Sequence, residues 1–166
     1  MNSPSLADEC LIYCQRYPEN KEDHKELIIR LCYLAGENAG QEANHLQARH
    51  YFSQAYKLVP SNIQFASNLA LSLSNSGDYD QSLAIYEQII ASLGYGDLGF
   101  SPLIWTEAVN LNDRKGNYHR TLELVEKCIL EVPENFNKEA LKFANEIRKK
   151  TGRFQREIII QIIHGL

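Results

Sequence analysis

A short element made of a glycine, a helix-capping position and an aromatic residue recurs along this chain of 166 residues. It reads Gly77-Asp78-Tyr79, returns 39 residues later as Gly116-Asn117-Tyr118, and after 36 more as Gly152-Arg153-Phe154. Glycine accepts the left-handed backbone on which helices end, and Asp or Asn caps the helix that follows. The recurrence therefore predicts helices joined by short turns and repeated at a period in the mid-thirties.

Apolar residues recur with helical spacing over nearly the whole chain, which predicts an all-α fold of about nine helices. We expect Ser3-Pro4 and Asn20 to begin the first two helices, and Ser61-Asn62 to begin the fourth. The expected apolar stripe of the second helix is Leu27, Leu31, Cys32 and Leu34. Such helices could form either a bundle or a solenoid.

The composition is that of an ordinary folded protein, with 44% hydrophobic and 23% charged residues. The length suits a single domain whose core needs no disulfide or metal. No apolar run approaches the roughly 18 residues of a membrane span. The first residues lack the basic and apolar regions of a signal peptide, so we expect a cytoplasmic protein.

Charge is distributed unevenly along the chain, whose net charge is −4. From Lys138 to Glu157 there are seven basic and three acidic residues. This stretch is either a basic patch for an acidic partner or a solvated helix face, and the interleaved acids favour the solvated face. Nucleic-acid binding through Lys138–Arg156 is a minor alternative, and we expect neither nucleic acid nor membrane as a partner.

The cysteines and histidines give little indication of a metal site. Cys10 and Cys14 are four residues apart and could share a helix face, but no second Cys or His pair at ligand spacing completes a site. Buried apolar packing is the favoured interpretation of these thiols. We expect no metal and no cofactor.

Sequence motifs of enzymes are also missing. The chain contains no HExxH, GxSxG, P-loop or GxGxxG motif. Spacing alone does not exclude a Cys–His nucleophile pair, but paired helices offer no obvious deep pocket for one. The sequence therefore favours a protein that is not an enzyme.

Three segments resemble the tetratricopeptide repeat family. That family places a Trp, a Leu-Gly pair and a Tyr on the first helix of each repeat, and an Ala, a Phe and a closing Pro on the second. The positions that carry the resemblance are Ala35-Gly36, Ala48, Phe52, Pro60, Leu69-Ala70, Tyr86, Trp105 and Pro133.

The resemblance implies a right-handed superhelical solenoid of antiparallel helix pairs, with about three to four repeats plus flanking helices. The 166 residues would then form a single domain. Its parts would be flanking helices in 1–28, repeats in 29–60, 63–94 and 102–133, and a degenerate repeat or capping helices in 138–166.

Members of this family bind proteins or peptides in a concave groove lined by the first helices, which is the function the resemblance implies. The implied groove residues are Arg30, Tyr33, Glu37, Gln64, Asn68, Leu71, Thr106, Glu107, Asn110 and Arg114. Amides such as Asn68 and Asn110 can both donate to and accept from a peptide backbone. One family subtype clamps a C-terminal carboxylate, but Glu107 would repel it, so we do not expect this binding mode.

The last segment is rich in isoleucine. Its β-branched run also suits a strand, but no partner strand is evident, so a helix is expected. One stripe of isoleucines could pack inward, but Ile160 would be left over. It could contact a second subunit, the chain could continue beyond this segment, or the helix could be wholly enclosed. A homodimer would make the chain a self-associating scaffold or dimeric chaperone-like adaptor, the alternative function. The candidate interface residues are Ile158, Ile159, Ile160 and Ile163.

Overall fold

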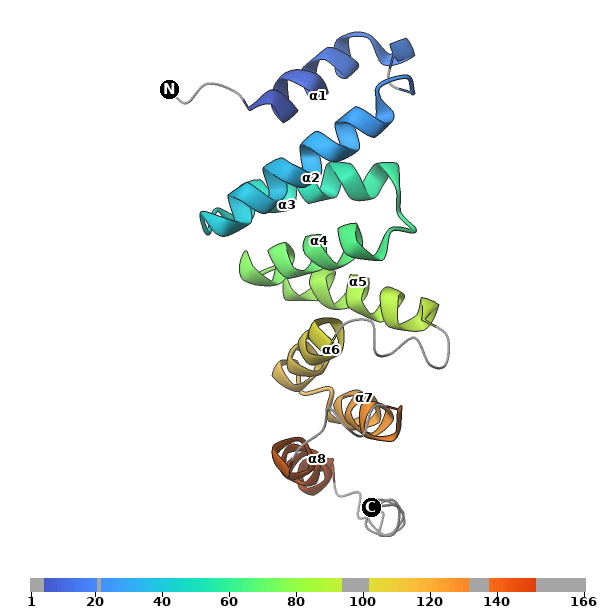
Figure 1. The fold of residues 1–166 in the computed structure, drawn as a ribbon. Helices are drawn as coiled ribbons and strands as arrows, with labels where there is room; N and C mark the ends of the chain where they lie inside the picture. The colour runs from blue at the N-terminus through green and yellow to red at the C-terminus, as the bar shows by residue number, and fades with distance from the viewer. Residues whose placement is uncertain (1–4, 21, 94–101, 132–137, 152–166) are drawn as a thin grey trace. The chain divides into compact units, whose positions relative to one another are not determined.

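The structure, a computed structural model, describes residues 5–20, 22–93, 102–131 and 138–151 (Figure 1). Within these ranges the chain is all-α, and no strand occurs there. It divides into two compact units, Met1–Ser92 and Leu93–Leu166. The helices are α1 (Leu6–Arg16), the 3-10 helix η1 (Pro18–Asn20), α2 (Lys25–Gln41), α3 (His45–Leu58), α4 (Ile63–Asn75), α5 (Tyr79–Ser92), α6 (Pro102–Arg114), α7 (Tyr118–Glu131) and α8 (Lys138–Thr151).

Each helix of the first unit packs against the next one along the chain, from α1 to α5. In the second unit α6 packs on α7, and α7 packs on α8. No helix in the described part of the chain is long and apolar enough to cross a membrane. The expectation of an all-α fold is confirmed for these residues, while the expected ninth helix lies outside them.

The first helix begins differently from the expectation. Ser5, and not Ser3-Pro4, is the N-cap of α1, because Ser5 Oγ accepts from the Asp8 amide at 3.2 Å and the Asp8 carboxylate accepts from the Ser5 amide at 3.1 Å. This reciprocal arrangement is a capping box, which satisfies two backbone donors at once. A Ser with an acid three residues later was therefore the stronger N-terminal signal.

The expectation that Asn20 caps the second helix is wrong. Asn20 ends η1, and its side-chain nitrogen donates to Tyr13 Oη at 3.0 Å. The His24 ring lies 2.8 Å from the Asn20 carbonyl oxygen, and His24 is the N-cap of α2. By contrast, Asn62 caps α4 as expected, since its Oδ1 accepts from the Phe65 amide at 3.1 Å.

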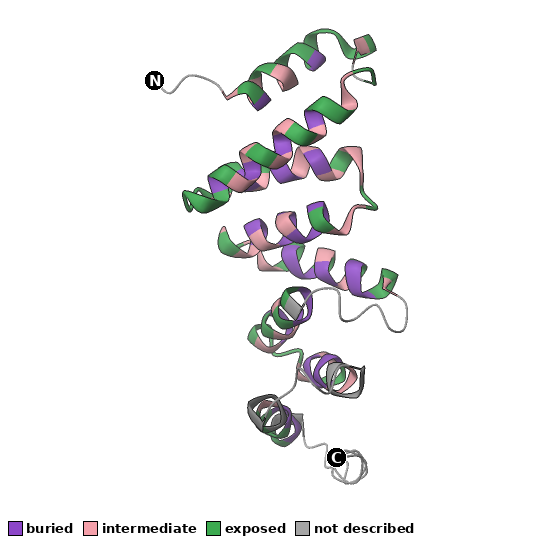
Figure 2. Cartoon of the chain, viewed as in Figure 1, coloured by how far each residue is buried: buried purple, intermediate pink, exposed green. Residues whose placement is uncertain are grey.

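The apolar stripe expected on α2 is correct only in part, because Cys32 is buried and Leu31 packs against the core. Leu27 and Leu34 are 49% and 57% exposed. The buried residues are Ile28, Cys32, Gly36 and Ala39 (Figure 2). Small side chains let α2 approach α3 closely, so the row that carries them faces inward, while Leu27 and Leu34 face outward.

Three turns between consecutive helices share one backbone geometry. Each connection has three residues, and its middle residue has a positive φ: 56° at Ala43, 89° at Gly77 and 73° at Gly116. In each turn the next amide donates to the carbonyl five residues earlier, at 2.8, 2.9 and 2.9 Å in order. This is the Schellman way of ending a helix. The expectation for Gly77 and Gly116 is confirmed, and Ala43 makes the same turn without a glycine.

The core of the first unit runs along the facing sides of its helices. On α3 the inward residues are Ala48, Tyr51, Phe52 and Ala55. On α4 most residues from Phe65 to Leu73 are buried (Figure 2). A buried hydrogen bond of 2.7 Å from Ser82 Oγ to the Ala70 carbonyl joins α5 to α4.

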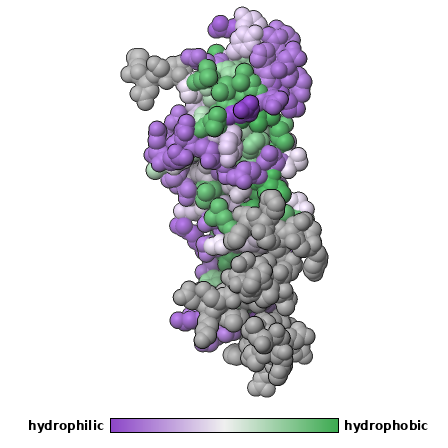
Figure 3. Space-filling view, viewed as in Figure 1, coloured by the Kyte–Doolittle hydropathy of each residue, from purple (hydrophilic) through white to green (hydrophobic). Residues whose placement is uncertain are grey.

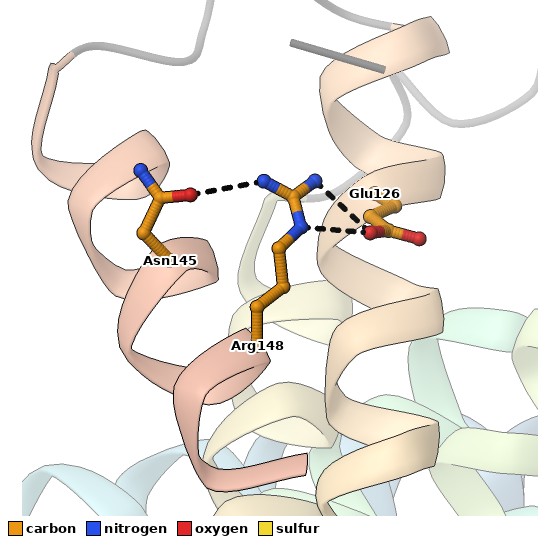
Figure 4. A network of polar contacts seen from close by, with 3 residues as sticks. All are labelled: Glu126, Asn145 and Arg148. Atoms are coloured by element: carbon orange, nitrogen blue, oxygen red, sulfur yellow. Dashed lines mark hydrogen bonds and ion pairs between the residues drawn. The ribbon is translucent and has the colours of Figure 1, made fainter. Parts of the chain in front are cut away.

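The second unit has its own apolar core and a largely buried ion pair. Trp105 on α6 and Leu122 on α7 are buried. Arg148 on α8, 7% exposed, donates from Nε and Nη2 to Glu126 Oε1 on α7 at 3.1 and 3.0 Å (Figure 4). Its Nη1 donates to Asn145 at 3.0 Å. This basic residue of the stretch from Lys138 therefore serves packing, while Lys142 and Lys149 are exposed.

Candidate binding groove

A pocket of about 270 Å³ lies between α2 and α4 in the first unit. We call it the α2–α4 pocket. Helix α3 contributes the edge of one aromatic ring and a histidine. The lining residues are Gly36, Glu37, Gly40 and Gln41 from α2, His45 and Phe52 from α3, and Asn68, Leu71, Ser72 and Asn75 from α4.

Two glycines of α2 explain why this face is hollow. A Cβ on Gly36 would lie 2.7 Å from Phe52 Cε1, so only glycine allows the ring of Phe52 to approach the helix this closely. At Gly40, one turn later, no described atom lies within 4 Å of the place a Cβ would take. Gly36 allows the short distance between α2 and α3, and Gly40 leaves the pocket beside it unfilled.

Three side chains form a hydrogen-bonded row at the pocket, and two of them, Glu37 and Asn68, line it. Asn68 Nδ2 donates to Glu37 Oε1 at 2.9 Å, which joins α4 to α2. Gln64 Nε2 donates to Asn68 Oδ1 at 3.1 Å along α4. Because a carboxylate only accepts, the nitrogen of Asn68 must face Glu37, and its amide orientation is therefore determined.

Asn68 keeps part of its bonding capacity. An amide group has two N–H donors and two acceptor lone pairs, and one of each is engaged by Glu37 and Gln64. The half-buried Asn68 can still donate once and accept once. An oriented amide with one donor and one acceptor left suits the backbone of an extended peptide.

The electrostatics of the pocket are set by Glu37. In the described part of the chain, no Lys, Arg or His nitrogen lies within 4.0 Å of its carboxylate. The surrounding unit is acidic as well, since residues 1–92 contain eleven Asp and Glu against six Lys and Arg, a net charge of −5. Among the described residues, the half-buried carboxylate of Glu37 therefore has no cationic partner, and the unit around it is acidic.

Of the groove residues expected on the first unit, the structure brings Glu37, Asn68 and Leu71 together in the pocket, with Gln64 bonded to Asn68. Tyr33 does not line the pocket, and its ring centroid lies 6.1 Å from that of Phe52. Arg30 is exposed at the other end of α2 and does not line the pocket.

The remaining groove residues expected from the sequence are on α6, in the second unit. Thr106, Asn110 and Arg114 are exposed and Glu107 is half-buried. Their expected role stays a prediction. The candidate interface isoleucines of the last segment lie outside the described residues.

Of the ten residues that line the pocket, only Glu37, Asn68 and Leu71 were among the expected groove residues, and Gly40 and Asn75 are two of those that were missed. Helix α2 continues through Gly40 to Gln41. The signal that could have found both is spacing. Gly36 and Gly40 are one helical turn apart, and Asn75 lies two turns beyond Asn68, so each pair shares a helix face.

A second hollow of about 270 Å³ lies among α1, α2 and α3. Its apolar wall includes Leu6 and Leu34, which are 66% and 57% exposed. Figure 3 shows hydrophobic side chains interrupting the hydrophilic surface of this unit. At the hollow's edge, Tyr51 Oη donates to the Asp8 carboxylate at 2.8 Å and lies 2.7 Å from Ser5 Oγ. This polar cluster holds the start of α1 against α3.

The thiols of the first unit belong to the core. Cys14 and Cys32 are buried and pack in one apolar cluster, with Cys10 beside it. Burial, with smaller contributions from nearby Cys10 and Asp8, raises the pKa of the Cys32 thiol to about 11. Among the described residues, no group of three or more His, Cys, Asp or Glu side chains is placed to hold a metal ion.

No protein-family model matches this chain, and no curated protein is significantly similar to it.

Proposed function

We propose that this chain is a protein-protein interaction module that binds an extended segment of a partner protein across the α2–α4 pocket. The observation that carries the proposal is the bond from Asn68 to Glu37, which joins the first helices of two successive helix pairs beside an open pocket. A half-buried polar row above an apolar floor is a common arrangement of ligand sites.

The fold we propose with it is a tetratricopeptide-like solenoid of antiparallel helix pairs. Its support is the repeated turn, which has the same length, positive φ and hydrogen bond at Ala43, Gly77 and Gly116. The first two of these are 34 residues apart, the period of that repeat family. Repeats of this kind expose the first helix of each pair on the face that binds partners.

Blocking the pocket without disturbing the fold tests the function. Gly40→Leu adds a side chain where space is open and replaces glycine by a strong helix former. The matched control is Asn38→Leu, an exposed position of α2 that faces the α1–α2–α3 hollow instead.

The experiment is affinity capture with the full chain, quantified by mass spectrometry. Proteins captured by the wild type should be retained by Asn38→Leu and lost with Gly40→Leu. Circular dichroism of the three proteins should be the same. A captured set that is unchanged by Gly40→Leu would show that the α2–α4 pocket is not the binding site.

A further inference from the structure

The α2–α4 pocket is too small for a cofactor or a drug-sized ligand. Its volume of about 270 Å³ is below the roughly 300–1,000 Å³ typical of small-molecule sites. A pocket of this size fits one side chain of a longer ligand. The question is therefore which side chain of a bound segment would enter it.

The floor of the pocket is apolar. Phe52 is 4% exposed and shows only the edge of its ring, and Leu71 is half-buried beside it. Gly36 and Gly40 present backbone without side chains. This floor suits the methylene stem of a long side chain better than a compact polar group.

The wall of the pocket is anionic. Asn68 holds Glu37 Oε1 at 2.9 Å, so the carboxylate is oriented and its second oxygen remains available. Glu37 has no ion-pair partner within 4.0 Å among the described residues. A half-buried carboxylate is screened less by water than an exposed one, so its attraction to a ligand cation is stronger than that of an exposed carboxylate.

We infer that the α2–α4 pocket takes a Lys or Arg side chain of a basic partner segment, with the methylene stem on Phe52 and Leu71 and the cation on Glu37. This inference rests on the proposed function and adds the chemistry of the partner. The net charge of −5 on residues 1–92 favours the approach of a basic segment and disfavours an acidic one.

The probe is a displayed library of random peptides, selected on the immobilised full chain. Wild-type protein should enrich peptides with one recurrent Lys or Arg, and Gly40→Leu should remove their binding. Selection on Glu37→Lys should enrich Asp or Glu at that place instead, because the charge of the wall is reversed.

An enriched peptide then gives the size of the effect by fluorescence anisotropy. Glu37→Gln keeps an oxygen to accept from Asn68 and removes only the charge, so affinity should fall about tenfold. Glu26→Gln removes the same charge from an exposed position of the same helix and should change affinity less than about twofold.

The outcomes separate the two proposals. If Gly40→Leu abolishes peptide binding but Glu37→Gln leaves the affinity unchanged, the inferred basic side chain is wrong, while binding in the α2–α4 pocket is still supported. A library that yields no binder sensitive to Gly40→Leu would overturn the groove and the basic side chain together. Enrichment of acidic peptides on the wild type would contradict the inferred charge directly.

Discussion

Asn68 on α4 donates a hydrogen bond of 2.9 Å to Glu37 on α2, although the two residues are 31 positions apart in the sequence. Helix α3 lies between them along the chain and packs against both of their helices. This bond therefore links two helices that are not consecutive. It closes the polar wall of the α2–α4 pocket on the side where a partner segment would lie.

The first prediction concerns the strength of this link. Asn68→Ala removes the bonds to Glu37 and Gln64, and should lower the free energy of unfolding by about 1–2 kcal/mol in urea denaturation. In a double-mutant cycle with Glu37→Ala, the two substitutions should couple by about 1 kcal/mol. Strictly additive effects would show that the bond contributes nothing.

The second prediction compares the two glycines of α2. Gly36→Ala places a Cβ 2.7 Å from a buried phenyl ring and should destabilise the protein by about 1–3 kcal/mol. Gly40→Ala meets open space on a helix and should be neutral or stabilising by up to about 1 kcal/mol. Thermal unfolding of both variants checks this. Equal destabilisation by the two would mean that close approach to Phe52 is not what requires Gly36.

The third prediction uses the repeated turn. Ala43 has a φ of 56°, a region that costs an L-residue roughly 1 kcal/mol, so Ala43→Gly should stabilise the protein by about 1 kcal/mol. The converse change at the equivalent position, Gly77→Ala, should destabilise it by a similar amount. Opposite shifts of the urea midpoint are expected. Loss of stability in Ala43→Gly would be inconsistent with the shared turn geometry.

The fourth prediction is a pH dependence at Asp8. Burial of the Asp8 carboxyl opposes its ionisation, but hydrogen bonds from Tyr51 and Ser5 outweigh this and lower its pKa below the ordinary 3.8. A carboxyl with a lowered pKa stabilises the folded state above its unfolded-state pKa. That stabilisation is lost as the pH falls through the folded-state pKa, so stability should decline below about pH 4.

Tyr51→Phe isolates this contribution. Removal of the phenolic donor should lower stability at neutral pH by about 1–2 kcal/mol and raise the pKa of Asp8. The difference between wild type and variant should therefore shrink on acidification, as measured by urea unfolding at several pH values. A difference that stays constant down to pH 2 would exclude Asp8 as the partner that matters.

Features encoded by neighbouring residues could be predicted from the sequence. Gly77 and Gly116 were identifiable because glycine is the usual residue at a left-handed helix end, and Asn62 because a cap depends only on the residues beside it. Ala43 could not be identified in this way, since alanine gives no signal for a positive φ.

The candidate site was predictable only in part. Glu37 and Asn68 were both expected on the binding face, but their mutual bond depends on the distance between α2 and α4, which spacing along one helix does not encode. Part of the buried face of α2 was also predicted wrongly, for a related reason. A search for apolar spacing gives weight to leucine and none to glycine. In the structure, the face of α2 that carries Gly36 is buried because it packs closely against Phe52.

The most direct test of the central claim is an NMR titration of the full chain with a peptide enriched from the library. Binding across the α2–α4 pocket predicts that the Gly40 backbone amide and the Asn68 side-chain amide shift most, and that both saturate with the affinity measured by anisotropy. Largest shifts on α1 or in residues 102–151, with Gly40 and Asn68 unmoved, would contradict it.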